Sequence, residues 1–222
     1  MNIKEYVDRE MLVIDVANIL AGDLKTALLT QDQVTFVVPG GTTPGPIFDI
    51  LCAADLDWSR VKIMLSDERW VPSDHARSNA KLLAERLLVE RAGAAQFVPF
   101  YVDEMTSEDG AAAVSAQIAD TLPISVLVLG MGADMHTASL FPNAIGLEAA
   151  LANDANALCA IQAQGQEPRV TLSGPALNGA MSKHLVIFGD DKRAALKATA
   201  GLSVHEAPIS AVTSGMTIHW AA

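Results

Sequence analysis

The sequence is poor in cysteine and in positive charge. Its 222 residues contain only Cys52 and Cys159, and 15 Lys and Arg stand against 26 Asp and Glu, which gives a formal net charge of −11. Two distant cysteines exclude a disulfide-rich scaffold, and no C-x-x-C pair is present for zinc or redox chemistry. The acidic balance argues against general binding of nucleic acids or anionic membrane surfaces, because such binding needs clustered positive charge.

Long apolar runs are also missing. No stretch reaches the ~18 uninterrupted apolar residues of a membrane span, and the first residues do not have the pattern of a signal peptide. We therefore expect a cytoplasmic protein. Half of the residues are nevertheless hydrophobic and 18% are charged, which is sufficient for a sizeable core. With no internal repeat, low-complexity run or long linker, the sequence predicts one domain over residues 1–222.

Apolar runs of strand length alternate with segments whose apolar residues recur every three or four positions. This alternation predicts an α/β fold with a largely parallel sheet covered by helices on both faces. Helices are expected within the first 30 residues, around 47–51, over 78–91, over 108–121 and from 192 to 200. Strands are expected at 34–38, 61–65, 96–102, 124–129, 158–162, 170–172, 185–188 and 217–220.

Polar clusters follow several of the expected strands. In open α/β sheets, ligands bind beyond the carboxyl ends of the strands, and parallel topology brings those ends to one edge. A single polar turn is weak support for a site, but five turns that converge on one edge are stronger. The five clusters are 40–43, 66–69, 130–136, 169–173 and 189–192.

The segment 39–44 reads Pro-Gly-Gly-Thr-Thr-Pro. Gly40 and Gly41 allow backbone N–H groups to approach a ligand, and a helix that begins here favours an anion. Thr42 adds a hydroxyl donor. The segment lacks the spacing and the Lys of a P-loop, so a nucleoside triphosphate is disfavoured. The alternative interpretation is a glycine turn that only begins a helix.

The segment 130–136 begins like a dinucleotide-binding fingerprint but has no third glycine, which makes an NAD site a poor interpretation. Instead, Asp134 and His136 follow the turn two residues apart. Imidazole is the usual general base near pH 7, and a neighbouring carboxylate can orient it. A hydrogen-bonded structural histidine is the alternative. A metal site is disfavoured because no third ligand is evident.

Four more charged residues at strand ends, and one near a helix start, have the chemistry of ligand contacts. Asp67 can orient a catalytic group or bind sugar hydroxyls, and Arg69 can hold a carboxylate or phosphate oxygen. Arg169 and Lys192 are expected phosphate ligands, and Arg77 is given a minor ligand role. Each alone is equally typical of a solvated surface charge. No Gly-x-Ser-x-Gly elbow is present, so hydrolysis would use activated water rather than a covalent serine.

Seven segments carry a more specific signal, in order over most of the chain. They are Pro-Gly-Gly-Thr-Thr-Pro at 39–44, Ser-Asp-Glu-Arg-Trp-Val-Pro at 66–72, Arg-Ser-Asn at 77–79, Leu-Gly-Met-Gly-Ala-Asp at 129–134, His-Thr-Ala-Ser-Leu-Phe-Pro at 136–142, Pro-Arg-Val-Thr-Leu at 168–172 and Gly-Asp-Asp-Lys at 189–192. In these segments the sequence resembles the 6-phosphogluconolactonases, of the larger group that includes glucosamine-6-phosphate isomerases.

The resemblance implies a Rossmann-like three-layer α/β/α domain. It also implies hydrolysis of 6-phospho-D-glucono-1,5-lactone to 6-phosphogluconate in the oxidative pentose phosphate pathway, without a metal or organic cofactor. The expected partner is a small sugar phosphate, and we expect a monomer, although the sequence does not fix the oligomeric state. His136 matches the family's proposed catalytic histidine. The matching ligand positions are Gly41, Thr42, Asp67, Arg69, Arg169 and Lys192.

Two other functions stay open at this point. A glucosamine-6-phosphate deaminase shares the fold, but that group typically carries a further acid just past the histidine, where this chain has none over 137–142. A non-catalytic sugar-phosphate sensor is the other alternative. It is kept open by Met135, which stands where the family usually has Gly between the Asp and the His. If the backbone there needs a positive φ, Met would cost about 1 kcal/mol.

Overall fold

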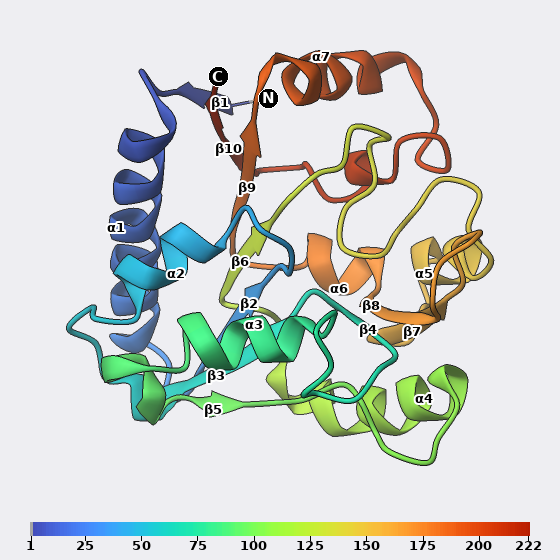
Figure 1. The fold of residues 1–222 in the computed structure, drawn as a ribbon, viewed down its shortest axis with the longest axis horizontal. Helices are drawn as coiled ribbons and strands as arrows, with labels where there is room; N and C mark the ends of the chain where they lie inside the picture. Colours follow the sequence, from blue (N-terminus) through green and yellow to red (C-terminus); the bar gives the residue numbers. More distant parts are fainter. Residues whose placement is uncertain (1) are drawn as a thin grey trace.

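A seven-stranded sheet runs through the centre of the computed structural model, which describes residues 2–222 (Figure 1). The strand order is β1-β10-β9-β6-β2-β3-β5, and the neighbouring strands in this order pair in parallel. The strands are β1 (Asn2–Glu5), β2 (Val34–Val38), β3 (Val61–Leu65), β5 (Gln96–Phe97), β6 (Val126–Leu129), β9 (Ser182–Phe188) and β10 (Thr217–Ala221). The predicted parallel sheet is confirmed.

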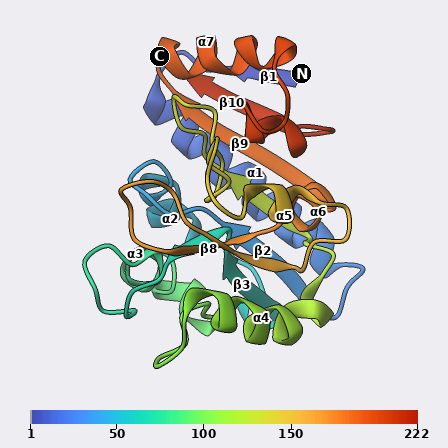
Figure 2. The same cartoon turned by 90° about the vertical axis from the view of Figure 1, so that its right-hand side faces the viewer.

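Helices cover both faces of this sheet. Figure 1 shows α1 and α2 on one side, with α5 and α6 on the other, and Figure 2 shows the same layers from the side. The α-helices are α1 (Arg9–Leu28), α2 (Gly45–Leu51), α3 (Asn79–Arg86), α4 (Ser107–Ile118), α5 (Leu147–Leu151), α6 (Gly174–Asn178) and α7 (Asp190–Ala198). Short 3₁₀ turns lie at Trp58–Arg60, Glu90–Ala94, Ala119–Thr121, Thr199–Gly201 and Pro208–Ala211. This arrangement confirms the three-layer α/β/α class.

The core forms where the apolar faces of the helices pack against the buried strands. All five residues of β2 and all four of β6 are buried, as expected for strands covered on both faces. Helix α1 turns Leu12, Val16, Leu20 and Leu24 inward at steps of four, and the side chain of Asp8 caps its first turn by accepting from the Met11 N–H at 2.8 Å.

No helix within residues 2–222 is both long and apolar enough to cross a membrane.

A second, smaller sheet corrects the sequence-based picture. Strands β4 (Asp67–Arg69), β8 (Arg169–Leu172) and β7 (Leu158–Ile161) pair antiparallel in the order β4-β8-β7. The sequence predicts a largely parallel sheet without assigning β7 and β8 to a second one, and these two strands lie in the antiparallel sheet. The segment after β3, expected as a polar turn, is a strand. Strands of three or four residues are too short for their alternation of apolar and polar residues to indicate the pairing partner or the strand direction.

Other boundaries also differ. The strand expected over 96–102 is only Gln96–Phe97, and the helix expected over 78–91 ends at Arg86. The edge strand β1 was not expected, because it contains polar residues and two of its charged side chains face solvent. Polar edge strands lack the apolar alternation by which strands are found, and their charges discourage further pairing.

The connections set where a ligand can bind. From β2 the chain proceeds to β3 and β5 on one side of the sheet, and from β6 it proceeds to β9 and β10 on the other. The strand order therefore reverses between β2 and β6, which are neighbours. Such a switch point, at the carboxyl ends of the strands, is the general ligand site of open α/β sheets.

Candidate active site

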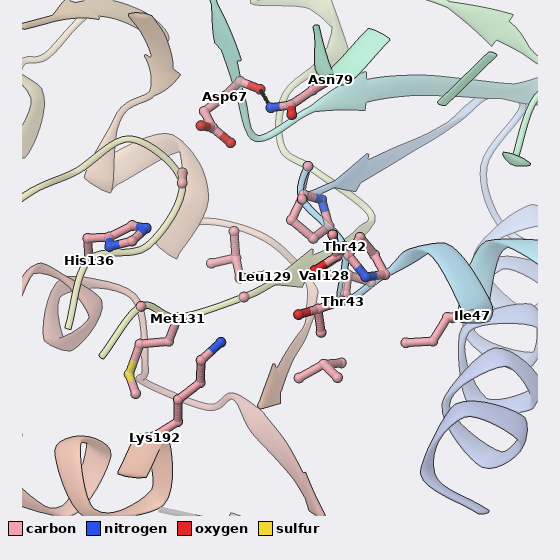
Figure 3. A pocket seen from close by; sticks show the side chains of 18 of the residues that line it. Thr42, Thr43, Ile47, Asp67, Asn79, Val128, Leu129, Met131, His136 and Lys192 are labelled. Carbon is pink, nitrogen blue, oxygen red and sulfur yellow. Dashed lines mark hydrogen bonds between the residues drawn. The ribbon is translucent and has the colours of Figure 1, made fainter. Parts of the chain in front are cut away.

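A cavity of ≈ 270 Å³ opens at the switch point (Figure 3). The segments after β2 and β6, strands β4 and β8, and helices α3 and α7 contribute to its wall. Among the residues expected from the sequence, the cavity is lined by Gly40, Gly41, Thr42, Asp67, Arg69, His136, Arg169 and Lys192. The fold thus gathers into one cavity residues that lie up to 152 positions apart in the chain.

His136 faces this cavity from the loop after β6, and Asp134 supports it from behind. The Nδ1 atom of His136 lies 2.5 Å from the Oδ1 atom of Asp134. The ring also packs against Phe141, with ring centroids 4.3 Å apart. Because the carboxylate takes the Nδ1 hydrogen, the Nε2 lone pair is available to accept a proton. The side chain is 30% exposed, so a water molecule can reach it.

Backbone hydrogen bonds form the turn that brings Asp134 and His136 together. The Gly132 N–H donates to the His136 carbonyl at 3.0 Å, and the Met135 N–H donates to the Gly132 carbonyl at 3.1 Å. A Cβ on Gly132 would lie 2.2 Å from His136 Nδ1, so only glycine leaves room for the imidazole. Met135 has φ 65°, which lies in the left-handed region. This is the positive φ considered above for the position where the family usually has Gly. Met at this position carries a strain of about 1 kcal/mol.

Asp67 lies deeper, 6% exposed. Its Oδ2 accepts from the Ser139 hydroxyl at 2.6 Å and its Oδ1 from the Ser66 hydroxyl at 3.1 Å. The Arg169 guanidinium approaches Oδ2 at 3.8 Å. The two carboxylates considered for orienting His136 therefore have different contacts. Asp134 contacts the imidazole, whereas Asp67 is held by two hydroxyls and an arginine.

Arg69 and Arg169 lie opposite each other on β4 and β8. Arg169 is 7% exposed, and burial lowers its pKa from the ordinary arginine value. Buried Nε atoms of both side chains have no hydrogen-bond partner among the described residues. Two adjacent guanidinium groups at a cavity, one half-buried and one buried, can bind the anionic oxygens of a ligand.

Lys192 and the turn after β2 complete the positive side of the cavity. Lys192 projects from the first turn of α7, and Figure 3 shows its ammonium group pointing into the cavity. Gly41 has φ 84° and Gly189, before α7, has φ 87°, conformations that glycine adopts at low cost. The charges of Arg69, Arg169 and Lys192 exceed that of Asp67, so the cavity is locally cationic in an acidic protein.

Arg77 is placed differently from the other expected ligands. It does not line the cavity, and its Nη1 lies 2.9 Å from Oε2 of Glu167 on the loop before β8. Its side chain is 56% exposed. The expected ligand role of Arg77 therefore has no support in the cavity geometry.

Three residues escaped the sequence reasoning. Ser139 holds Asp67, Asn79 lines the cavity, and buried Glu68 accepts four hydrogen bonds at the start of α3. All three lie inside the motif segments quoted above, which was the available signal. Their contacts join residues at least ten positions apart or involve backbone atoms, so no spacing rule indicates them.

Among residues 2–222, no three His, Cys, Asp or Glu side chains are grouped so as to hold a metal ion. The cavity residues themselves offer acid–base chemistry at His136 and binding of an anion by guanidinium, ammonium and backbone N–H groups.

The fold and the cavity together define a class: an α/β protein of the switch-point type, with an anion pocket next to an imidazole–carboxylate pair. Comparison with known proteins specifies the class further. Residues 7–220 match the family model described as glucosamine-6-phosphate isomerases/6-phosphogluconolactonase, and the chain belongs to this family.

Named relatives agree with this assignment. A 6-phosphogluconolactonase of Pseudomonas aeruginosa is 39% identical over 206 residues, covering 90% of this chain and 87% of the relative. One from Rhizobium meliloti is 36% identical over 228 residues, covering 99% and 98%. The crystal structure of a 6-phosphogluconolactonase from Shewanella baltica superposes with a TM-score of 0.96 at 33% identity, covering 100% of this chain and 98% of that one.

Proposed function

We propose that this protein is a hydrolase that opens 6-phospho-D-glucono-1,5-lactone to 6-phosphogluconate. The observation that carries the proposal is the His136–Asp134 pair, which faces a cavity with three cationic side chains. Relatives that cover nearly the whole chain are 6-phosphogluconolactonases by name. These relatives indicate a sugar phosphate as the class of substrate. Within this class we propose the lactone, because the His136–Asp134 pair can activate the water that opens its ring.

In the proposed mechanism, His136 acts first as a base and then as an acid. Nε2 takes a proton from a water molecule as the water oxygen forms a bond to C1 of the lactone. The carbonyl electrons move onto the carbonyl oxygen, and Arg69 stabilises this oxyanion. When the oxyanion collapses, the bond from C1 to the ring oxygen breaks, and the imidazolium gives its proton to that oxygen. Such acid–base assistance contributes typically 10²–10⁴-fold.

Asp134 keeps the imidazole in the tautomer this mechanism needs. Its carboxylate accepts the Nδ1 hydrogen, which leaves Nε2 free to accept a proton, and it stabilises the imidazolium once formed. Asp67, which contacts Ser66, Ser139 and Arg169 and not His136, is proposed to bind a sugar hydroxyl or to hold the attacking water. In both roles the hydroxyls of Ser66 and Ser139 fix its orientation.

The phosphate of the substrate takes no part in the reaction and serves to place the lactone. We assign it to Arg169, Lys192 and the backbone donors of Gly40, Gly41 and Thr42. Anchoring a remote group converts binding free energy into orientation, which can rival the proton transfer in its effect on rate. Arg77 is left without a direct role, because it is paired with Glu167.

We also propose that the chain acts as one domain over residues 1–222, as a monomer, and in the cytoplasm, where the oxidative pentose phosphate pathway operates. One seven-stranded sheet uses strands from both ends of the described chain, since β1 pairs with β10. This pairing supports a single cooperative unit. Light scattering on the purified protein tests the monomer, and a single unfolding transition tests the single domain.

The function is tested with freshly made 6-phosphogluconolactone in a pH-stat, with the spontaneous hydrolysis rate subtracted. Acid release proportional to enzyme concentration is the expected result. Glucosamine 6-phosphate is offered in parallel, because the family model also covers the isomerases. Ammonia release without lactone hydrolysis would assign the chain to that branch. Binding of 6-phosphogluconate with neither activity would make it a sensor.

A further inference from the structure

Asn79, the first residue of α3, occupies a junction between three segments of the cavity wall. Its side chain is 2% exposed yet lines the cavity. The Nδ2 group donates to the Asp67 carbonyl at 2.9 Å, a contact drawn in Figure 3. The Oδ1 atom accepts from Nη1 of Arg69 at 2.8 Å. One amide thus fixes the backbone of one site residue and the guanidinium of another.

The third segment is the glycine turn after β2. A Cβ on Gly40 would lie 2.0 Å from Oδ1 and 2.3 Å from Nδ2 of Asn79, so the turn packs directly against the amide. Only a glycine permits this approach. The Asn79 side chain therefore lies between the turn after β2 and strand β4 and contacts both.

Asn79 is itself held rigidly from below by Glu68, which is 1% exposed. The carboxylate accepts from the backbone N–H groups of Arg69, Asn79 and Ala80, each at 2.8 Å, and from the Ser78 hydroxyl at 3.0 Å. Four donors satisfy a carboxylate that has no cationic partner among its hydrogen bonds. This anchor holds the backbone at Asn79, and the contacts with Asp67 and Arg69 hold its side chain.

We infer that Asn79 is a positioning residue that sets the orientation of the Arg69 guanidinium toward the substrate. Of the Arg69 hydrogen bonds, one goes from Nη1 to Asn79 and one from Nη1 to the Arg77 carbonyl at 2.6 Å. Both hydrogen bonds use Nη1, while the described residues offer no acceptor to the buried Nε atom. By holding Nη1, Asn79 fixes the orientation of a guanidinium that lines the cavity. The inference about catalysis depends on the proposed lactonase activity, whereas the inference about Arg69 does not.

The kinetic test uses a double-mutant cycle between Asn79→Ala and Arg69→Ala. Because Asn79 acts through Arg69, we expect Asn79→Ala to lower kcat/KM by about 10- to 100-fold, the range for losing one hydrogen bond to a charged group. In the Arg69→Ala background the same substitution should cost less than about 2-fold, since the interaction is already absent. Equal losses in both backgrounds would overturn the inference.

Ser78→Ala is the matched control. It removes the helix cap to the Lys81 N–H at 3.3 Å and one hydrogen bond to Glu68. The three backbone N–H groups that bind Glu68 keep Asn79 in place, and the Ser78 side chain does not contact Arg69. We expect it to lower the melting temperature as Asn79→Ala does while leaving kcat/KM unchanged. Should Ser78→Ala lower kcat/KM as much as Asn79→Ala, the effect would come from α3 stability and the inference would be wrong.

An activity-independent measurement separates this inference from the proposed function. The Nε–H resonance of Arg69, assigned by its loss in Arg69→Lys, is expected to shift in Asn79→Ala and to stay in place in Ser78→Ala. An unchanged resonance in folded Asn79→Ala overturns the positioning role, whatever the enzyme catalyses. If Asn79→Ala does not fold, Asn79→Asp replaces it. This isosteric change retains the acceptor for Arg69 and removes the donor to the Asp67 carbonyl, so the inference predicts kcat/KM within a few fold of the wild type. A loss as large as that of Arg69→Ala would assign the effect to the Asp67 contact and would overturn the inference.

Discussion

Residues 2–222 contain two histidine–carboxylate contacts whose surroundings are opposite. At the cavity, His136 contacts Asp134 at 2.5 Å, and the two side chains are 30% and 53% exposed. Inside the fold, His184 contacts Asp23 at 2.8 Å, and the His184 side chain is 6% exposed. The residue types and distances are similar, so neither of them separates a catalytic pair from a structural one.

The buried contact belongs to a longer chain of hydrogen bonds. His184 Nδ1 lies 3.1 Å from His219 Nε2, and His219 Nδ1 lies 2.9 Å from the Tyr6 hydroxyl, which donates to Asp15 at 2.8 Å. Both nitrogens of each imidazole therefore have partners, and burial lowers the pKa of His219 to about 4. His136, in contrast, keeps one nitrogen for the cavity. The free nitrogen and its access to water distinguish the site from the network.

The largest expected effect on the catalytic rate comes from removing His136 from the His136–Asp134 pair. His136→Ala should lower kcat for the lactone by about 10²–10⁴-fold, because it removes the acid–base group. Binding of 6-phosphogluconate, measured by calorimetry, should remain within a few fold. His205→Ala is the control, since His205 is exposed and makes no contact with the cavity. Near-normal turnover of folded His136→Ala would remove the residue from its proposed role.

A smaller effect is expected from the carboxylate of the same pair. Asp134→Asn should lower kcat by about 10-fold, because an amide holds the Nδ1 hydrogen less strongly and stabilises the imidazolium less. The exposed carboxylate is screened by water, which limits the loss. Steady-state kinetics with saturating lactone measure it. A loss as large as that of His136→Ala would mean that Asp134 does more than orient the ring.

Breaking the buried network should affect stability rather than rate. His219→Leu leaves the Tyr6 hydroxyl and His184 Nδ1 without their partner, which should lower the free energy of unfolding by about 1–3 kcal/mol. Urea unfolding measures this change, and kcat per folded molecule should match the wild type. A fall in kcat without a fall in stability would show that the network communicates with the cavity.

The pH dependence of stability should separate the two regions further. The folded pKa of His219, about 4, lies below its ordinary value of 6.5, so the unfolded chain binds more protons between these pH values. Wild-type stability should therefore fall as the pH decreases from about 6.5 to 4. His219→Leu should flatten this part of the urea-derived curve. A curve of unchanged slope in His219→Leu would contradict the assignment.

The comparison also shows how far the sequence predicts the molecule. Asp134 and His136 are two residues apart after a strongly apolar strand, so their contact is a local property that spacing indicates. His184 and Asp23 lie 161 residues apart, and the His184–His219 contact depends on the register of β9 and β10. Register is set by the packing of the whole sheet, and no motif records it.

The same distinction applies to the fold and to the cavity. The strands β2, β3 and β6 were predictable because their runs are predominantly apolar, with one polar residue each in β2 and β3. The sheet formed by β4, β7 and β8 was not, because very short strands pair according to tertiary contacts. Arg69 and Arg169 were expected at the cavity as separate strand ends, yet they meet as cross-strand neighbours. Asn79 was not expected, since its role lies in contacts that only the fold creates.

The most direct test of the proposed lactonase activity follows the conversion of fresh 6-phosphogluconolactone by NMR, with wild-type protein, His136→Ala and buffer alone in parallel. We predict that 6-phosphogluconate forms at a rate proportional to wild-type concentration, while the variant stays close to the spontaneous rate. A wild-type rate equal to that of buffer would contradict the proposed lactonase, and equal rates for wild type and variant above that of buffer would contradict the role of His136.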